Sequence, residues 1–348
     1  MSDVIKKRDS SIDLLRILAM LGVVVLHVAR TSGALSLDAA TCLEGKLSSN
    51  ICESFTIYSV NIFALVTGYL CALSKTNYSR YLELYFSTVF YYVGILCVVW
   101  VCIGARTVGV DVMKNLIPTK LPYWYVVSYT VLFFLMPFLN KLVLALSKRE
   151  LLVCSCSLIL FLSVLPGFES QNLASHGHNV MWLVTMYLCG AYVKLYPPTI
   201  SIRVLLPLYM ACTTCLFVSL QFFHVENVYF RYYTSPFVSL GAISFFIMMC
   251  RLELKSTLIV SVLSRLSPLA FGVYLIHCHP YVWKLLEAKL RIIGEYCDYS
   301  WWFIPAISVL IYLFCSFVDA LRSLLFSVLK VRRCSDFIIS RLRSVLPW

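Results

Sequence analysis

The stretch from Ser11 to Arg30, SIDLLRILAMLGVVVLHVAR, decides how the rest of the sequence is interpreted. It is an apolar run of nearly membrane-spanning length with basic residues on both sides. Two groups that lipid rejects, Arg16 and His27, lie inside it, eleven positions apart. Eleven steps of ~100° come within ~20° of three full turns, so both side chains lie on one helix face, ~16 Å apart along the axis. Buried polar groups of this kind indicate a functional site, because burial without a partner is costly.

The composition is that of a polytopic membrane protein. The chain of 348 residues is 60% hydrophobic and 13% charged, with a mean hydropathy of +0.84. Soluble domains have roughly 45–50% apolar and about 25% charged residues. We therefore expect an all-α protein with one membrane-embedded domain over residues 1–348. Its about ten transmembrane helices are expected near 11–30, 52–73, 84–104, 122–146, 150–166, 179–196, 204–223, 234–250, 266–285 and 302–328.

The basic residues indicate the orientation of these spans. Roughly twice as many Lys and Arg lie at the N-terminus, in the even-numbered loops and in the tail 329–348 as in the remaining loops. An even number of spans with cytoplasmic N- and C-termini fits this asymmetry. The net charge of +12 is then a signal of topology and no indication of nucleic-acid binding. In this orientation Arg16 lies near the cytoplasmic side and His27 lies towards the outer side.

His27 and Arg16 are the first candidates for chemistry. Imidazole titrates near neutrality and is the usual general base for a hydroxyl, although a hydrogen bond to a neighbouring helix also explains a lone histidine in a span. An ion pair with Asp13, or snorkelling to the headgroups, likewise explains Arg16 on its own. Their shared face favours a joint role.

Other polar residues at membrane depth have a packing explanation beside a functional one. Asn61 and Thr67 lie in the second span, where amides and hydroxyls are typical of helix packing. Glu53, at the outer end of the same span, is placed to orient His27. Trp124 opens the span 122–146, where an aromatic residue is typical of the membrane interface.

A basic, aromatic patch follows the second span. Lys75 and Arg80 stand with Tyr78 and Tyr81 in a loop that we expect on the cytoplasmic side. Guanidinium groups match phosphate oxygens, so the patch suits a nucleotide-containing donor, and the general excess of basic residues in cytoplasmic loops explains it equally.

The remaining histidines and cysteines give weaker signals. His277 and His279 are expected near the outer mouth, where they either bind a polar acceptor or line the mouth structurally. The pair His176 and His178 has no third ligand nearby in the sequence, and we predict no metal site. Cys42 and Cys52 share one loop, and whether they form a disulfide depends on the compartment that the loop faces.

Five segments together resemble acyltransferase family 3 of integral membrane proteins, and more narrowly its exopolysaccharide and O-antigen O-acetyltransferase branch. One departure is that the R-x-x-R of the family stands here as Arg80-Tyr81-Leu82-Glu83, without its second cation. The matching segments are Arg16 with His27 in an IDLLRILA…HV frame, VNIFALVTGYL at 60–70, Tyr123-Trp124-Tyr125 through Pro137-Phe138-Leu139-Asn140, Trp182 through Tyr192, and Phe271 through Pro280.

The resemblance implies transfer of an acyl group, usually acetyl, from cytoplasmic acyl-CoA to a hydroxyl of a lipid-linked or surface polysaccharide. We therefore expect a multi-pass O-acetyltransferase of the plasma (inner) membrane, which transfers groups other than aminoacyl groups. Acetyl-CoA is the expected donor substrate and no cofactor is expected to be bound. The partners expected are acyl-CoA, the glycan or lipid-linked saccharide and the lipid bilayer, with no nucleic acid.

The expected roles follow from this reaction. His27 is the base, and Arg16 orients the CoA end. The other candidates are Arg80, Asn61, Thr67 and Trp124 on the donor and acyl-binding side, and His277, His279 and Glu53 on the acceptor side.

Two other classes of protein stay open. A polytopic transporter or exporter of a glycan or small metabolite is the main alternative, and a membrane-embedded binding or sensing protein is the second. The absence of internal repeats and the scarcity of carboxylates inside the spans count against transport. The acceptor sugar and its hydroxyl, the acyl chain, direct or covalent transfer, and the oligomeric state are not readable from the sequence.

Overall fold

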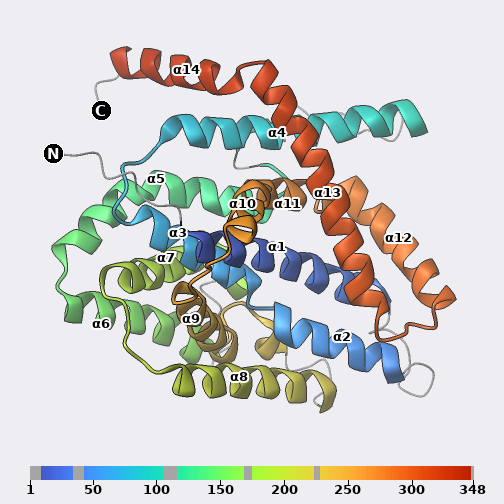
Figure 1. Cartoon of the computed structure of the whole chain (residues 1–348), viewed down its shortest axis with the longest axis horizontal. Helices are drawn as coiled ribbons and strands as arrows, with labels where there is room; N and C mark the ends of the chain where they lie inside the picture. The colour runs from blue at the N-terminus through green and yellow to red at the C-terminus, as the bar shows by residue number, and fades with distance from the viewer. Residues whose placement is uncertain are drawn as a thin grey trace.

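The computed structural model describes residues 9–33, 43–104, 116–118, 120–167, 175–222 and 228–345. Within these ranges the chain forms helices and connecting turns and no strand. The helices, labelled as in Figure 1, are α1 (Ser10–Thr31), α2 (Leu43–Thr56), α3 (Ser59–Cys71), α4 (Tyr78–Ile103), α5 (Trp124–Ala145), α6 (Lys148–Ile159), α7 (Val180–Leu195), α8 (Ile202–Phe222), α9 (Pro236–Cys250), α10 (Thr257–Leu266), α11 (Ala270–His277), α12 (Pro280–Tyr296), α13 (Phe303–Val328) and α14 (Val331–Val345).

The expected class of fold, an all-α polytopic membrane protein, is confirmed. In the described part of the chain, 8 helical stretches are long and apolar enough to cross a membrane, and α7 is a shorter apolar helix. Large apolar side chains point outward along these stretches, as Phe314 and Phe317 do on α13. Such exposure is expected where lipid, rather than water, surrounds the helices.

Several spans differ from the expected ones in their bounds or in their type of helix. The second begins earlier, at Leu43, and a turn at residues 57–58 divides it into α2 and α3. The fifth starts as α6 and continues as a π-helical turn over Leu160–Val164. The ninth, expected at 266–285, runs instead over Thr257–His277. Pro280 ends it because proline favours the first turn of a new helix, and α12 begins there.

The first helix lies at the centre of the molecule. Asp9 caps it, because its carboxylate accepts a hydrogen bond from the Ser11 amide at 3.2 Å. Helix α1 packs against α2, α3, α9, α10, α11, α12 and α13, and Figure 1 shows it surrounded by them. Its polar residues therefore have interior neighbours on several sides.

Glycines bring α3 and α7 into close contact. A Cβ atom at Gly68 would overlap the backbone carbonyl of Tyr187, and one at Gly190 would overlap the carbonyl of Leu65. Small residues allow this approach, which transmembrane helices use in place of the hydrophobic effect. The close packing fixes the part of α3 that carries Asn61 and Thr67.

A buried ion pair joins α13 to α4. Arg322 and Asp319 form two hydrogen bonds, of 2.7 and 3.1 Å, and their side chains are 15% and 1% exposed. The Tyr91 hydroxyl donates to Asp319 at 2.7 Å, and Arg322 donates to Ser87 at 3.1 Å. Asp319 and Arg322 thus each have several polar partners, as burial requires.

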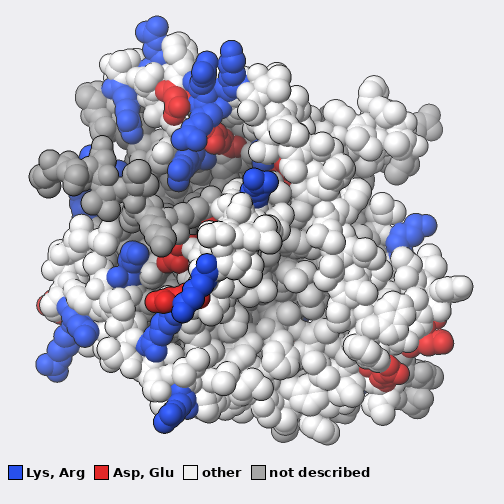
Figure 2. Space-filling view, in the orientation of Figure 1, with Lys and Arg blue, Asp and Glu red and all other residues white. Residues whose placement is uncertain are grey.

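Basic residues gather at one end of the molecule. The N-terminal end of α1 and the C-terminal end of α14 both point towards the left of Figure 1. In the same orientation, Figure 2 shows most of the visible Lys and Arg at the left and few at the right. The molecule therefore has a basic end, which carries both ends of the described chain.

Candidate functional site

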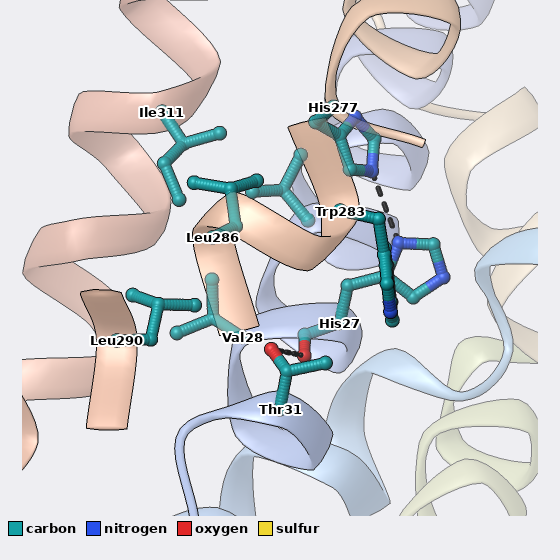
Figure 3. Close-up of a pocket in the computed structure, with 9 residues that line it drawn as sticks. His27, Val28, Thr31, His277, Trp283, Leu286, Leu290 and Ile311 are labelled. Carbon is teal, nitrogen blue, oxygen red and sulfur yellow. Dashed lines mark hydrogen bonds between the residues drawn. The ribbon is translucent and has the colours of Figure 1, made fainter. Parts of the chain in front are cut away.

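Two histidines from distant parts of the chain meet between α1 and α11. His27 lies in the second half of α1, and His277 is the last residue of α11. The Nδ1 atom of His27 lies 3.0 Å from the Nε2 atom of His277, and the ring centroids are 5.2 Å apart. Figure 3 shows the two imidazoles facing each other. The structure thus pairs the residue expected to act as base with one expected separately at the acceptor side.

The direction of the hydrogen bonds follows from the surroundings. The Nδ1 atom of His277 lies 2.6 Å from the carbonyl oxygen of Val273, which only accepts, so this nitrogen carries the proton. In a neutral ring the Nε2 atom of His277 is then an acceptor, and Nδ1 of His27 is its donor. This assignment leaves Nε2 of His27 with an unprotonated lone pair. A tautomer fixed in this way is what a general base needs.

A small pocket adjoins the histidine pair. The ring of Trp283 meets His27 edge-on, with centroids 4.8 Å apart. Thr31 donates its hydroxyl hydrogen bond to the His27 carbonyl at 2.7 Å, which leaves little polar surface in the pocket. The remaining lining is aliphatic and comes from α1, α12 and α13 (Figure 3), namely Val24, Val28, Leu286, Leu290 and Ile311. Such a lining suits the apolar part of a small group next to a reactive nitrogen.

A thiol also contacts both rings. The Sγ atom of Cys278 lies 3.3 Å from Nε2 of His277 and 3.6 Å from Nδ1 of His27. Cys278 caps α11, and its backbone N–H donates to the Tyr274 carbonyl at 3.0 Å. Three side chains with nitrogen or sulfur donors therefore meet at one point.

Arg16 points into the bundle from the first half of α1. Its side chain is half-buried, and it interacts electrostatically with Tyr125 and Tyr129 of α5. It also interacts with Cys71 at the end of α3 and with Tyr312 of α13. Arg16 and His27 are thus both turned towards neighbouring helices, although the small pocket reaches His27 alone of the two.

Glu53 lies beside two arginines instead of beside His27. Its side chain is fully buried, and Arg30 and Arg231 approach it at 2.7 and 3.0 Å. Each arginine uses Nε and Nη2, so both carboxylate oxygens are occupied. The expectation that Glu53 orients His27 differs from this arrangement, in which His277 is the partner of His27. Together Glu53, Arg30 and Arg231 carry one net positive charge. This charge lies close to His27, because Arg30 follows it by one helical turn on α1.

Three residues expected on the donor and acyl-binding side make their contacts away from His27, namely Asn61, Thr67 and Trp124. Asn61 is fully buried, accepts from Trp182 Nε1 at 2.8 Å and donates to the Tyr233 carbonyl at 2.8 Å. The Thr67 hydroxyl donates to the Phe63 carbonyl at 2.8 Å. None of the three is among the residues that line the pocket beside His27 in the described chain.

Trp124 belongs to an aromatic cluster at the start of α5. It stacks on Tyr233 with centroids 6.1 Å apart and lies 4.6 Å from the ring of His178. His178 stands in the turn before α7, and burial lowers its pKa below the ordinary value. This cluster adjoins Arg30, whose guanidinium also donates to the Tyr233 hydroxyl.

His279 is buried. Its Nδ1 atom accepts a hydrogen bond from the Tyr281 amide at 3.3 Å, so His279 caps α12. Its ring packs between those of Tyr92 and Tyr123, with centroids 5.6 and 6.5 Å away. Because the residue is 0% exposed, the expected place at an open mouth is not where the structure puts it.

Arg80 stands at the start of α4, on the surface. Its amide donates to Asn77, which caps the helix. Beside it, the turn before α4 and the helix α14 enclose an open polar cleft, lined by Lys75, Thr76, Asn77, Tyr78, Ser79, Asp336 and Arg343. The guanidinium of Arg343 lies over the Tyr78 ring, 6.0 Å from its centroid. The cleft includes part of the basic, aromatic patch expected from the sequence.

Sequence reasoning missed several residues of these sites. In the sequence Arg30 is only a charge at the end of the first span, whereas in the structure it pairs with Glu53. Trp283 and Cys278 carried no signal of their own, because only the fold brings them to His27. Arg343 lies in a tail that was interpreted through its charge alone. Whether Cys42 forms a disulfide with Cys52 stays open, because Cys42 lies outside the described residues.

The fold and the site define a polytopic α-helical membrane protein with a paired-histidine centre between its helices. A family model described as "Acyltransferase domain" (Acyl_transf_3) matches residues 9–318. The chain therefore belongs to the Acyl_transf_3 family and is a membrane acyltransferase. The comparisons with curated proteins and with solved structures found no match. The matched range includes both histidines and ends within α13, so that α14 lies beyond it.

Proposed function

We propose that this acyltransferase moves an acetyl group from acetyl-CoA to a hydroxyl of a cell-surface or lipid-linked polysaccharide. His27 is the general base, and His277 is the positioning residue that fixes its tautomer. The acceptor approaches from the side of His27, and the donor approaches from the basic end of the molecule.

The observation that carries this proposal is the hydrogen-bond relay from His27 through His277 to Val273. The Val273 carbonyl holds the His277 proton at 2.6 Å, and His277 then holds the His27 proton at 3.0 Å. The free lone pair of His27 Nε2 is thereby available for an incoming hydroxyl. A structural histidine would need a partner as well, and what supports the role of a base is that this relay leaves the lone pair on Nε2 of His27.

The transfer step balances with these groups. Nε2 of His27 takes the proton from the acceptor hydroxyl while the hydroxyl oxygen attacks the thioester carbonyl carbon. A new C–O bond forms and the C–S bond to CoA breaks. The CoA sulfur leaves as a thiolate and receives the proton that His27 had taken, so the base is restored.

Arg16 serves the donor in this proposal. It lies ~16 Å from His27 along α1, on the side of the basic end, and it interacts electrostatically with two tyrosines of α5. Cys71 interacts electrostatically with both Arg16 and Arg80, so the two cations flank the same end of α3. Two cations between the basic end and His27 suit a donor that carries several phosphates.

The polar cleft against α14 is our candidate for the nucleotide end of the donor. Lys75 and Arg343 supply positive charge, and Tyr78 supplies a ring face suited to a base. Asp336 is the one acidic residue of the lining, so two of its three charges are positive. The second cation that the R-x-x-R pattern would supply is replaced here by Arg343 of α14.

The basic end is assigned to the cytoplasm. Lys and Arg are enriched in cytoplasmic segments of membrane proteins, and Figure 2 shows their concentration at the end that carries the described chain ends. In a plasma (inner) membrane this orientation gives the donor side access to cytoplasmic acetyl-CoA. The histidine pair then lies towards the outer side, where a surface or lipid-linked glycan is met.

The test is acetyl transfer by the purified protein in liposomes. Acetyl-CoA with a radiolabelled acetyl group is supplied, and the acceptor is surface polysaccharide isolated from cells that lack this protein. Label should move to the polysaccharide, and mass spectrometry should show the added acetyl group. Uptake of polysaccharide into the vesicles without acetylation would support the transporter alternative and overturn the proposal.

Two variants examine the histidine pair in the same assay. His27→Gln should lower the rate by about 10²–10⁴-fold, because it removes the base. His277→Gln should lower the rate less and change its pH profile, since the ring of His27 loses its fixed tautomer. The control His176→Gln, in the turn near Tyr232, should retain the wild-type rate. A fully active, folded His27→Gln protein would remove His27 from the role of base.

A further inference from the structure

We propose that His27, His277 and Cys278 form a binding site for a thiophilic divalent cation, of which Zn²⁺ is the representative, and that its occupation switches off the acyltransferase. The existence of the site depends on geometry alone. The inhibitory effect rests on the proposed role of His27 as base. A metal site was not expected from the sequence, in which His27 and His277 stand 250 positions apart.

The three donor atoms already have nearly the spacing that a metal ion requires. Nitrogen ligands bind Zn²⁺ at ~2.0–2.1 Å and thiolates at ~2.3 Å, so the donors of a tetrahedral site lie about 3.3–3.6 Å from one another. Here the separations are 3.0 Å between the two nitrogens, and 3.3 and 3.6 Å from the sulfur to each nitrogen. The described chain contains no other group of at least three such residues this close together. Shifts of a few tenths of an ångström would admit the ion.

The surroundings of His277 have the arrangement found around metal-binding histidines. A metal-binding imidazole usually donates its second ring N–H to a carbonyl or carboxylate, which fixes the ring. Nδ1 of His277 makes this bond with the Val273 carbonyl, and Nε2 is therefore turned towards His27 and Cys278. One ligand is thus held in position before any ion arrives.

The type of donor selects the type of ion. Imidazole and thiolate ligands favour Zn²⁺ and copper over Mg²⁺ and Ca²⁺, which prefer oxygen. Binding would release the thiol proton of Cys278. Three protein ligands leave a fourth position for water or a substrate oxygen.

Occupation of the site conflicts with catalysis by His27. The ion takes the lone pair of Nδ1, so the neutral ring must carry its proton on Nε2. Nε2 is the atom that accepts the hydroxyl proton in the transfer step, and it can no longer do so. The ion therefore blocks His27 as a base without any change in the fold.

Cobalt provides a test of binding that is independent of activity. Co²⁺ is added to the purified, chelator-treated protein in detergent, and absorption from charge transfer between thiolate and Co²⁺ is followed in the near ultraviolet. We expect a band that saturates at one ion per chain and disappears when Zn²⁺ is added in excess. Cys278→Ser should abolish the band, and His277→Gln should weaken binding by at least about tenfold.

A matched variant controls for the other cysteines. Cys215→Ser removes an exposed thiol of α8 and should leave the band unchanged. If the wild-type protein shows no saturable band, or if Cys278→Ser retains it, the site does not exist. Thermal unfolding without metal checks that Cys278→Ser is folded, and a rise in the wild-type unfolding temperature with Zn²⁺ should be absent from this variant.

The inhibitory part is measured in the acetyl-transfer assay. Zn²⁺ should inhibit the wild-type protein, whereas Mg²⁺ should not. For Cys278→Ser, relative to its own rate with chelator, the concentration of Zn²⁺ for half-inhibition should rise at least about tenfold. A protein that binds Co²⁺ through Cys278 and transfers no acetyl would contradict the proposed function and leave the metal site standing. Transfer that full occupation by Zn²⁺ does not slow would overturn the inhibitory role.

Discussion

His27 and His277 are 250 positions apart in the chain, and their ring nitrogens lie 3.0 Å from each other. The contact joins the first membrane helix to the last turn of α11. It places the only free ring nitrogen of the pair, by our proton assignment, on His27.

Replacing Arg16 by lysine should reduce acetyl transfer more than it reduces stability. A lysine keeps the positive charge but lacks the planar fork that bonds to phosphate or carbonyl oxygens at two points. We expect the KM for acetyl-CoA to rise, with little change in the thermal unfolding temperature. The control is Arg203→Lys, at an exposed position at the start of α8, which should change neither quantity. A fully active Arg16→Lys protein would contradict a role for Arg16 in orienting the donor.

Replacing Glu53 by glutamine should destabilise the protein by about 3 kcal/mol, the lower end of the range for breaking a buried ion pair. The two arginines would face each other across a neutral amide. The loss stays at this lower end because their side chains are 32% and 29% exposed and keep part of their hydration. Equilibrium unfolding in detergent measures the change. Glu287→Gln, which breaks the exposed pair with Arg291, should cost less than about 1 kcal/mol, and equal losses in the two variants would contradict the prediction.

Replacing Gly68 by alanine should destabilise the protein by about 1–3 kcal/mol, as overpacking does. The added methyl group would meet the backbone of Tyr187, which cannot move aside as a side chain can. Gly94→Ala is the matched control on α4, because no atom lies within 4 Å of the added carbon there. Alanine favours a helix over glycine by up to about 1 kcal/mol, so the control should be neutral or stabilising. Thermal unfolding compares the two, and a neutral Gly68→Ala would mean that α3 and α7 are packed less closely.

The wild-type protein should become less stable as the pH decreases, partly because of His178. Burial lowers the pKa of His178 in the folded protein, so the unfolded chain binds the proton more readily. The stabilising contribution is therefore complete above the unfolded pKa of about 6.5, and it is lost as the pH falls from there towards the folded pKa. His178→Gln should show a smaller loss of unfolding temperature between pH 7 and pH 5. An identical pH dependence in the two proteins would contradict this assignment.

The helices could be predicted from the sequence because hydropathy is a local property. The bounds of α1, α5 and α13 lie within a few residues of the expected spans. The end of α11 at His277 was harder to predict. The apolar residues continue through Pro280 into α12, and only the proline marks the boundary between the two helices. The sequence does carry a signal for the ion pair of Asp319 with Arg322, namely two opposite charges three positions apart inside a span.

The site was harder to predict from the sequence than the helices were, because contacts between distant residues depend on how the helices pack. Arg16 and His27 were found through their shared helix face, which needs only the geometry of one helix. The partner of His27 could not be found in the same way. Glu53 was a reasonable candidate by its depth in the membrane, but Arg30 and Arg231 are better partners for a buried carboxylate than a neutral imidazole is.

The central place of α1 has a consequence for how the protein is made. The ribosome delivers this helix first, yet its neighbours α11, α12 and α13 are among the last to be made. At ~5–20 residues per second, about 12–50 s separate the synthesis of His27 from that of His277, its partner 250 positions later. During that interval the first helix carries a histidine whose partner has not yet been made. We expect the translocon or a chaperone to keep α1 out of contact with lipid until then. A chain that terminates before α11 should be recognised and degraded.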